Sequence, residues 1–471
     1  MSEVWLAKHQ LLAVPVIVKT LRRALREAEG ADAAGRIISE ARLMARVASP
    51  CIVRALDAGQ IEGSGAPFLV QEYVDGLDLA ELDRRRRAAL GVGLPLWFVC
   101  HVLREISGGL RAAHRAGVVH RDLKPSNVFG APETGIRLGD FGIAVARAEE
   151  VRDSSGTLKF MAPEQFRTGE VGRFTDGWRA AATACDLRYG AAPFASMGEV
   201  LDPACAPRLP PPASPAEAYF QEVLRWMLEK DLCRRPEDLA APAHHFEMLA
   251  KAVPPPAIGA SLIDACTFVV GPVRVTLVVG DISEAHADAI VSSANYRLQM
   301  RSGVGESLRR RGGDVIEEEA QRDGEQPLGS CLRTSPGSLA ARHVFHAVGA
   351  WNEVSCIGRA FMRALLLADE HGCRSLAVPA LGTGVARVGL EASANAIFQA
   401  LRWHAMLGGM RLREVTVWLD SPAKKRVFAD VAEEVLGIVD AGALRTVDLG
   451  VPVEGPPSPE AATLLDGRSK G

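Results

Sequence analysis

Two short stretches in the first half of the chain concentrate side chains that can bind a metal ion and accept a proton. The first stretch, HRDLKPSN, spans residues 120–127, and the second, DFG, spans residues 140–142. Asn127 and Asp140 offer the hard oxygen ligands that Mg²⁺ prefers, and Asp122 adds a further carboxylate. The residue types and their spacing therefore predict a magnesium-dependent site.

A third stretch, APE at residues 162–164, follows these two. In this order the three motifs resemble those of the eukaryotic-type (Hanks-type) bacterial Ser/Thr protein kinases, and the combination is highly specific. The resemblance covers about residues 1–252 and implies a bilobal α+β fold. It also implies that the γ-phosphate of ATP is transferred to a serine or threonine of a protein substrate, a reaction that needs positioning and charge neutralisation.

The resemblance assigns a role to each polar residue of these motifs. Asp122 would orient the substrate hydroxyl and accept its proton, and Lys124 would place a cation near the transferring phosphoryl group. Asn127 and Asp140 would hold Mg²⁺. Lys19, at the end of a Val-Ile-Val-Lys strand, would hold the α- and β-phosphates of ATP.

Further positions follow from the same resemblance. Glu40 would pair with Lys19 from the next helix, Asp176 would brace the catalytic loop, and Arg235 would pair with Glu164. The remaining nucleotide-binding positions are Val4, which stands on the valine of the family's G-x-G-x-x-G-x-V motif, and the adenine-binding hinge residues Gln71, Glu72 and Val74. Arg121 suggests control by phosphorylation of the activation loop, because a guanidinium clamps a phosphate well, and Ser154 or Ser155 is the expected acceptor.

The chain departs from the family at its start. The glycine-rich loop that covers the phosphates is missing, and Ser2 stands where its last glycine belongs. Either the start codon was assigned too late, or the chain binds ATP weakly. A pseudokinase scaffold is the alternative from another function class, although the sequence keeps Lys19, Asp122 and Asn127.

The second half of the chain carries a different set of motifs. They are GDI at 280–282, DAIVSSAN at 288–295 and PALGTGV at 379–385, with strands and helices alternating between them. They resemble the macro domain family over about residues 262–440, which implies an α/β three-layer fold with ADP-ribose as ligand.

This second resemblance also assigns residues. Asp281 would accept a hydrogen bond from the adenine amino group, and Asn295 would contact the distal ribose. Backbone N–H groups would wrap the diphosphate, and they belong to Gly303, Val304, Gly382, Thr383, Gly384 and Val385.

The macro motifs lack the residues of hydrolytic members. Ser292 replaces the first asparagine, and Gly305 stands at the acidic position, with Glu306 beside it. Without that acid no group is in place to activate water. We therefore predict a domain that reads ADP-ribose or an ADP-ribosylated protein, with ADP-ribosyl hydrolysis and loss of binding as alternatives.

Composition, net charge and cysteine spacing give the remaining expectations. Of the 471 residues 48% are hydrophobic and 24% are charged, and the net charge is −3, which favours a globular chain without nucleic-acid or membrane partners. The nine cysteines lack C-x-x-C spacing and, with no visible secretory signal, fit a cytoplasmic location. The resemblance leaves room for a dimer that phosphorylates itself in trans.

Hydrophobic periodicity predicts the helices and strands that position these motifs. Strands are expected at 4–7, 16–19 and 68–73, helices at about 33–48 and 96–113, and two strands within 258–279. Residues 253–261, with prolines at 254–256, are the expected linker, and 441–471 the expected disordered tail. A solvated face is expected for residues 84–87, and structural roles for His343, His346, Trp178 and Trp418.

Overall fold

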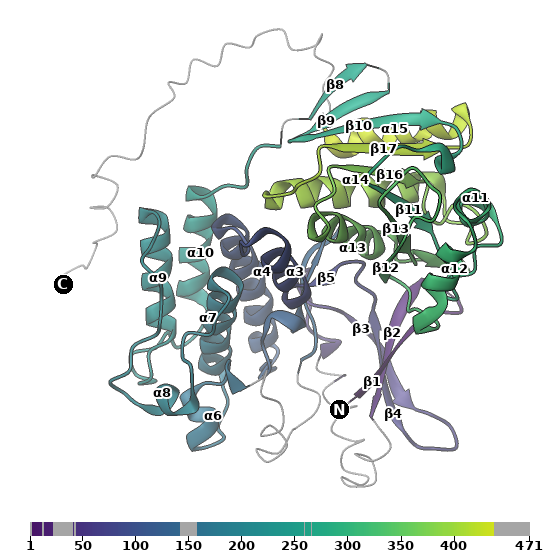
Figure 1. Cartoon of the computed structure of the whole chain (residues 1–471). Helices are drawn as coiled ribbons and strands as arrows, with labels where there is room; N and C mark the ends of the chain where they lie inside the picture. The colour runs from purple at the N-terminus through teal and green to yellow at the C-terminus, as the bar shows by residue number, and fades with distance from the viewer. Residues whose placement is uncertain are drawn as a thin grey trace. The chain divides into compact units, whose positions relative to one another are not determined.

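A computed structural model describes residues 2–11, 14–21, 41, 44–141, 158–258, 260–264 and 266–437 (Figure 1). Several predicted features lie outside these residues: Glu40, most of the helix at 33–48, Gly142, Ser154, Ser155 and the tail at 441–471. Residues up to 438 form one compact unit by their contacts. Within it, residues up to 258 are called the N-terminal half and residues from 260 the C-terminal half.

The N-terminal half begins with an antiparallel four-stranded sheet in the order β1-β2-β4-β3. Strands β1 (Ser2–Lys8) and β2 (Pro15–Leu21) confirm the predicted hairpin, and Val4 lies opposite Lys19 in their register. Strands β3 (Ala55–Gln60) and β4 (Pro67–Glu72) complete the sheet. The side chains of β4 alternate between buried and half-buried, so the sheet covers a core on one face.

Helices make up most of the rest of this half. The predicted apolar helix is α4 (Leu96–Arg115), and its buried residues recur at helical spacing. Asp78 accepts a hydrogen bond from the N–H of Glu81 and caps α3 (Leu79–Leu90), which ends at Gly91 in the left-handed region. The other helices are α6 (Pro163–Arg167), α7 (Arg173–Tyr189), α8 (Met197–Leu201), α9 (Pro215–Met227) and α10 (Ala240–Ala252).

A small three-stranded sheet carries the catalytic motifs. It consists of β5 (Leu77–Asp78), β6 (Val128–Ala131) and β7 (Gly135–Leu138), with the short 3₁₀ helix Pro125–Asn127 directly before β6. The hairpin β6–β7 therefore joins the stretch at 120–127 to the stretch that begins at Asp140. Its compact geometry is what brings the two motifs together.

The C-terminal half is built on a mixed eight-stranded sheet in the order β12-β13-β11-β16-β17-β10-β9-β8. The five strands from β13 to β10 run parallel, and the pairs at both edges are antiparallel. The strands are β8 (Ala260–Asp264), β9 (Thr267–Val270), β10 (Val273–Val279), β11 (Ala289–Ser293), β12 (Cys331–Thr334), β13 (His343–Ala347), β16 (Ser375–Pro379) and β17 (Glu414–Leu419). Residues 258–279 thus form three strands, and the prediction of two was wrong because Cys266 begins an additional turn.

Helices cover the central strands of this sheet. Every residue of β11 except Ser293 is buried, as expected for a parallel strand that is covered on both faces. Helices α13, α14 and α15 pack against one another, and Figure 1 shows α11 and α12 away from them. Their bounds, with those of the hairpin β14–β15, are α11 (Gly303–Gly312), α12 (Val315–Ala320), α13 (Ile357–Glu370), α14 (Leu390–Leu407), α15 (Pro422–Leu436), β14 (Ala350–Trp351) and β15 (Val354–Ser355).

The two halves touch through the arginine run of α3, and the prediction of a solvated face was wrong for Arg86. Arg86 is 1% exposed and donates hydrogen bonds to the carbonyl oxygens of Leu407 and Gly408, at 3.0 and 3.1 Å. Arg85 forms an ion pair with Glu370 of α13 at 2.7 Å. Arg84 stays exposed and Arg85 and Arg87 are half-buried, so Arg86 is the residue of the run that is buried where α3 lies against α13.

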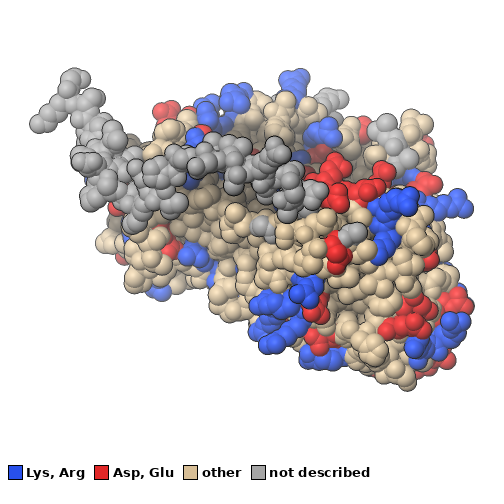
Figure 2. All heavy atoms as spheres, turned by 90° about the horizontal axis from the view of Figure 1, so that it is seen from above, with Lys and Arg blue, Asp and Glu red and all other residues tan. Residues whose placement is uncertain are grey.

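Among the described residues, no helix combines the length and the apolarity that a membrane span needs. Figure 2 shows small clusters of basic and acidic side chains side by side on the face it presents. Trp178 and His346 are buried as predicted, with 1% and 0% of their surface exposed.

Candidate functional site

The predicted catalytic carboxylate lies at the centre of a polar cluster in the loop before β6. Lys124 Nζ lies 2.8 Å from Asp122 Oδ2. The Asn127 amide donates to the backbone carbonyl of Asp122 at 2.7 Å and approaches Oδ2 at 3.3 Å. These three predicted residues are brought together within one loop, and the Asp122 side chain stays 32% exposed.

Asp176 of helix α7 holds this loop by hydrogen bonds, as predicted. One Asp176 oxygen accepts hydrogen bonds from the backbone N–H of His120 and from the His114 ring, at 2.9 and 2.7 Å. The other accepts the N–H of Arg121 at 2.9 Å. Arg121 adopts a left-handed φ of 67°, a strained conformation that these bonds offset.

A second brace holds α6 in the same half. Arg235 and Glu164 form the expected ion pair at 2.9 Å, with the arginine side chain fully buried. Thr175 also donates its hydroxyl to Glu164 at 3.0 Å. A buried charge pair with additional hydrogen bonds fixes geometry more than it stabilises the fold.

Lys19 of β2 pairs directly with Asp140, across the space between the four-stranded sheet and the helices. Burial lowers the pKa of Lys19 to about 8. Phe141 is buried against the His120 ring, with 4.5 Å between ring centroids. The predicted Glu40 partner of Lys19 lies outside the described residues, so Asp140 is the carboxylate that Lys19 contacts here.

The donor set of Asn127 and Asp140 fits a hard divalent cation. A carboxylate and an amide oxygen are typical ligands of Mg²⁺, which also keeps several waters and binds phosphate oxygens. The N–H of Gly139, just before Asp140, donates to the carbonyl oxygen of Asn127 at 2.9 Å, so the two candidate ligands lie at the same end of the β6–β7 hairpin. Among the described residues, no group of three or more His, Cys, Asp or Glu side chains could hold a metal by itself.

The predicted hinge follows β4. Gln71 and Val74 are buried, and Glu72 pairs with Arg54 at 2.9 Å. The next acidic residue, Asp75, accepts hydrogen bonds from the first N–H groups of α13 in the C-terminal half, those of Gly358 and Arg359, each at 2.8 Å. A carboxylate at a helix N-terminus is a favourable arrangement, so the hinge is anchored to the C-terminal half.

Arg179 is a residue of this site that the sequence reasoning missed. It follows Trp178 on α7, is 2% exposed, and places Nη1 3.1 Å from Asp122 Oδ1. The available signal was its position three residues after Asp176, on the face of α7 that holds the catalytic loop. A charged residue in an otherwise buried helix needs a charged partner, and Asp122 is that partner.

The C-terminal half contains a cavity of about 410 Å³ at the ends of β10, β16 and β17. Asp281, Gly303, Val304 and Thr383 line it, which brings together four of the predicted ADP-ribose residues. Its wall also includes Ser307, Lys424 and Trp418. Trp418 was predicted to be a core residue; it packs on the core and also faces this cavity.

Asp281 is already hydrogen-bonded within the cavity wall. The Ser307 hydroxyl lies 2.7 and 2.5 Å from its two oxygens, and the N–H of Ser283 donates at 2.9 Å. Burial alone would raise the pKa of Asp281, but these hydrogen bonds outweigh it and lower the pKa below its ordinary value. Asp281 is therefore held as an oriented anion that can accept a further hydrogen bond.

The two glycine loops differ in their reason for glycine. Gly303 begins α11 with φ 55° and open space around it, so its backbone conformation alone favours glycine. Gly382 has φ 73°, and a Cβ there would meet Ala350 and Ile357 at 3.0 Å. Gly382, Gly384 and Val385 do not line the cavity, and Val385 is 74% exposed.

Asn295 is not brought into the cavity. Its side-chain oxygen accepts the N–H groups of Arg297 and Gln299 at 2.9 and 3.3 Å, and its amide donates to the Gln299 carbonyl at 3.0 Å. Asparagine commonly closes turns in this way. The side chain therefore stabilises its own loop, in contrast to the predicted ribose contact.

The position of the missing acid is tightly packed. A Cβ on Gly305 would lie 3.2 Å from the Met300 Cα, so a larger residue would require Met300 to shift by a few tenths of an ångström. Glu306 is exposed and does not line the cavity. The carboxylates that line this cavity are those of Asp281 and Asp420, and neither stands at the acidic position after Gly303 and Val304.

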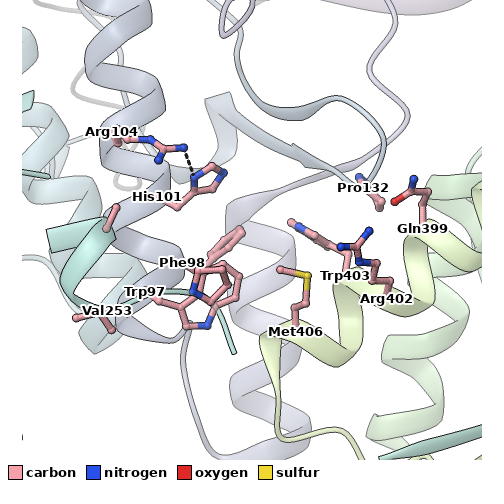
Figure 3. Close-up of a pocket in the computed structure, with 12 residues that line it drawn as sticks. Trp97, Phe98, His101, Arg104, Pro132, Val253, Gln399, Arg402, Trp403 and Met406 are labelled. Atoms are coloured by element: carbon pink, nitrogen blue, oxygen red, sulfur yellow. Dashed lines mark hydrogen bonds between the residues drawn. The ribbon is translucent and has the colours of Figure 1, made fainter. Parts of the chain in front are cut away.

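A further cavity of about 410 Å³ lies between α4 and α14 (Figure 3). It contains none of the predicted site residues. Aromatic, methionine and arginine side chains face it, and they include Trp97, Phe98, Arg104, Arg402, Trp403 and Met406. Phe98 and Trp403 meet edge to face at 5.4 Å, so aromatic packing joins the two halves here.

Comparison with known proteins identifies two family models in the chain. The model described as "Protein kinase domain" matches residues 1–246, and the model described as "Macro domain" matches residues 291–397. The first match covers more than half of the 471 residues.

Individual relatives match one region each. The serine/threonine-protein kinase PknL of Mycobacterium tuberculosis is 36% identical over 159 residues, which are 33% of this chain and 38% of PknL. The uncharacterized protein PAE1111 of Pyrobaculum aerophilum is 40% identical over 142 residues, which are 29% of this chain and 78% of that protein. The crystal structure of the PknI kinase domain of Mycobacterium tuberculosis is 26% identical, with a TM-score of 0.41, and covers 53% of this chain and 91% of that one.

Proposed function

Because the chain belongs to the protein kinase family and carries a macro domain after its kinase region, we propose that it transfers the γ-phosphate of ATP to serine or threonine side chains of proteins. The chain spans 38% of the length of PknL, so this activity is proposed for the chain itself. We assign residues 1–252 to the kinase domain, 253–261 to the linker and 262–440 to the macro domain.

One observation carries the kinase proposal: Asp122, Lys124 and Asn127 form a single hydrogen-bonded cluster beside the Lys19–Asp140 pair. In this arrangement Asp122 orients the substrate hydroxyl and accepts its proton, and Lys124 neutralises charge on the transferring group. Lys19 binds the α- and β-phosphates. Asn127 and Asp140 would hold Mg²⁺, which when bound neutralises the triphosphate.

Autophosphorylation with labelled ATP and Mg²⁺ tests this proposal. We expect the chain to label itself, and Asp122→Asn to reduce the rate at least a thousandfold, because the amide cannot accept the hydroxyl proton. The Asn side chain has nearly the same shape and its oxygen can still accept from Arg179, and the unfolding midpoint of the two proteins checks that the fold is kept. Equal labelling of the two proteins, or no labelling of either, would overturn the kinase proposal.

For the macro domain we propose binding of ADP-ribose, free or attached to a protein, without hydrolysis. Support comes from the cavity that joins the Asp281 carboxylate to the N-terminus of α11 at Gly303. The carboxylate can accept from an adenine amino group, and the helix N-terminus favours a diphosphate. Gly305 carries no side chain at the acidic position, and its tight contact with Met300 leaves little room for one.

Titration calorimetry with ADP-ribose tests the binding proposal. We expect saturable heat at micromolar ligand, and no heat up to millimolar ligand would refute it. Incubation with an ADP-ribosylated protein separates the two macro functions. Release of free ADP-ribose by the intact chain, lost in Asp281→Ala, would replace binding by hydrolysis.

A further inference from the structure

Arg179 connects three segments of the kinase region from a buried position. Its Nη1 lies 3.1 Å from Asp122 Oδ1 and donates to the carbonyl oxygen of Leu123 at 3.3 Å. Its Nε donates to Gln165 Oε1 at 3.0 Å. Helix α7 thus reaches the catalytic loop and α6 through one side chain.

Burial of this guanidinium carries an energetic cost. Only 2% of Arg179 is exposed, and a charge removed from water is tolerated only with a charged partner and further hydrogen bonds. Asp122 supplies the partner, and the Leu123 and Gln165 oxygens supply the bonds. The arrangement therefore ties the arginine to the predicted catalytic carboxylate.

The two oxygens of Asp122 are held by different groups. Oδ2 contacts Lys124 at 2.8 Å, and Oδ1 contacts Arg179 at 3.1 Å. Contacts on both oxygens fix the rotation of the carboxylate about its Cβ–Cγ bond. Because 32% of the side chain is still exposed, a substrate hydroxyl can reach it.

The contact with Gln165 extends this link to α6. The same Gln165 oxygen accepts the N–H of Ala162, the residue before α6, at 3.1 Å. Ala162 directly precedes α6, so the guanidinium joins the catalytic loop to the start of α6. Reaction rates respond steeply to such positioning, because small misplacements lower the fraction of reactive geometries.

We propose that Arg179 is a positioning residue for phosphoryl transfer: it orients the Asp122 carboxylate and ties it to the start of α6 through Gln165. The inference rests on the proposed kinase function. It concerns the rate of transfer at saturating ATP and leaves nucleotide binding to Lys19, Asn127 and Asp140.

The test measures autophosphorylation of the full chain over a range of ATP concentrations. Arg179→Met removes the charge and both links, and we expect the maximal rate to fall between about tenfold and a hundredfold, the size of a lost charge-assisted hydrogen bond. The KM for ATP should stay within twofold. Arg179→Lys keeps a cation near Asp122 and should recover most of the loss.

Two further variants separate positioning from simple destabilisation. Gln165→Met removes the bond from Arg179 and the bond from the Ala162 N–H but keeps the contact of Arg179 with Asp122, so it should lower the maximal rate less than Arg179→Met does. Arg86→Met removes another buried arginine, one that binds backbone carbonyls far from Asp122 in sequence. It should lower the unfolding midpoint and leave the maximal rate within twofold.

The outcomes are distinct. If the natural chain does not label itself, the proposed kinase function fails. If it does and Arg179→Met matches it within twofold, or loses only ATP affinity, the positioning role is wrong. The role is also wrong if Arg179→Lys is as slow as Arg179→Met, because the rate would then not depend on the charge beside Asp122.

Discussion

The polar cluster of the kinase region and the cavity of the macro domain are built from different chemical groups. In the cluster, charged side chains bind one another directly, as Lys19 with Asp140 and Asp122 with Lys124 and Arg179. In the cavity, Asp281 is held by hydroxyl and backbone donors. A site built from charged side chains is therefore easier to recognise in a sequence than a site built from backbone N–H groups, because backbone groups are the same for almost every residue type.

The difference also follows from distance along the chain. Asp122, Lys124 and Asn127 lie within six residues, so one loop conformation brings them together. Asp281, Gly303 and Thr383 come from three separate elements, and only the order of the parallel strands makes them neighbours. A motif predicts its own loop well and its distant partners poorly.

The comparison predicts that activity depends on the charged side chains of the kinase region, and the largest loss of activity is expected on substitution of Lys19. Lys19→Met should lower kcat/KM for autophosphorylation about a hundredfold to a thousandfold, since it removes the cation that we propose binds the phosphates of ATP. A steady-state assay with labelled ATP measures this change.

Lys8→Met is the matched control on the same hairpin. Lys8 pairs with Glu353 at 2.8 Å, away from Asp140, and we expect its kcat/KM to stay within twofold of the natural value. A similar loss in both variants would mean that the hairpin, and not the Lys19 charge, determines activity.

A smaller effect is expected from pH in the macro domain. Burial lowers the pKa of His346 to about 4, and its Nε2 lies 2.9 Å from the Thr334 hydroxyl. The unfolded chain binds this proton near pH 6.5, so the neutral ring's stability contribution is complete above pH 6.5 and is lost as pH falls toward 4. The loss should reach about 3 kcal/mol.

Urea unfolding at pH 7, 5.5 and 4.5 checks this prediction. His346→Gln should weaken the pH dependence, whereas His286→Gln, at an exposed position of the same half, should leave it unchanged. An unchanged slope in His346→Gln would show that other groups carry the acid sensitivity.

The smallest expected effect is a change in the affinity for ADP-ribose, and it tests whether the cavity beside Asp281 is the ligand site. Asp281→Ala should weaken ADP-ribose binding about tenfold, the cost of one lost hydrogen bond to a charged acceptor. Asn295→Ala should change the affinity less than twofold, because this side chain is occupied by its own turn. Calorimetry of both variants decides between them, and a larger loss in Asn295→Ala would restore the predicted ribose contact.

The sequence predicted local elements more reliably than long-range contacts. Periodicity located the β1–β2 hairpin and α4, and motif spacing located the Asp122 cluster. The burial of Arg86 was not predictable, because it depends on carbonyl groups more than 300 positions further along the chain. Arg179 was missed for a similar reason, since its partner lies on another element.

The prolines at 254–256 between the halves would suggest two domains that fold and move independently of each other. Arg86 argues otherwise, because a guanidinium that is 1% exposed in the intact chain would lose its carbonyl acceptors if the chain were cut at 254–256. Trp403 would be uncovered on the other fragment. One chain therefore joins two families and also packs their surfaces against each other. Neither half can be removed without exposing groups that are buried in the intact chain.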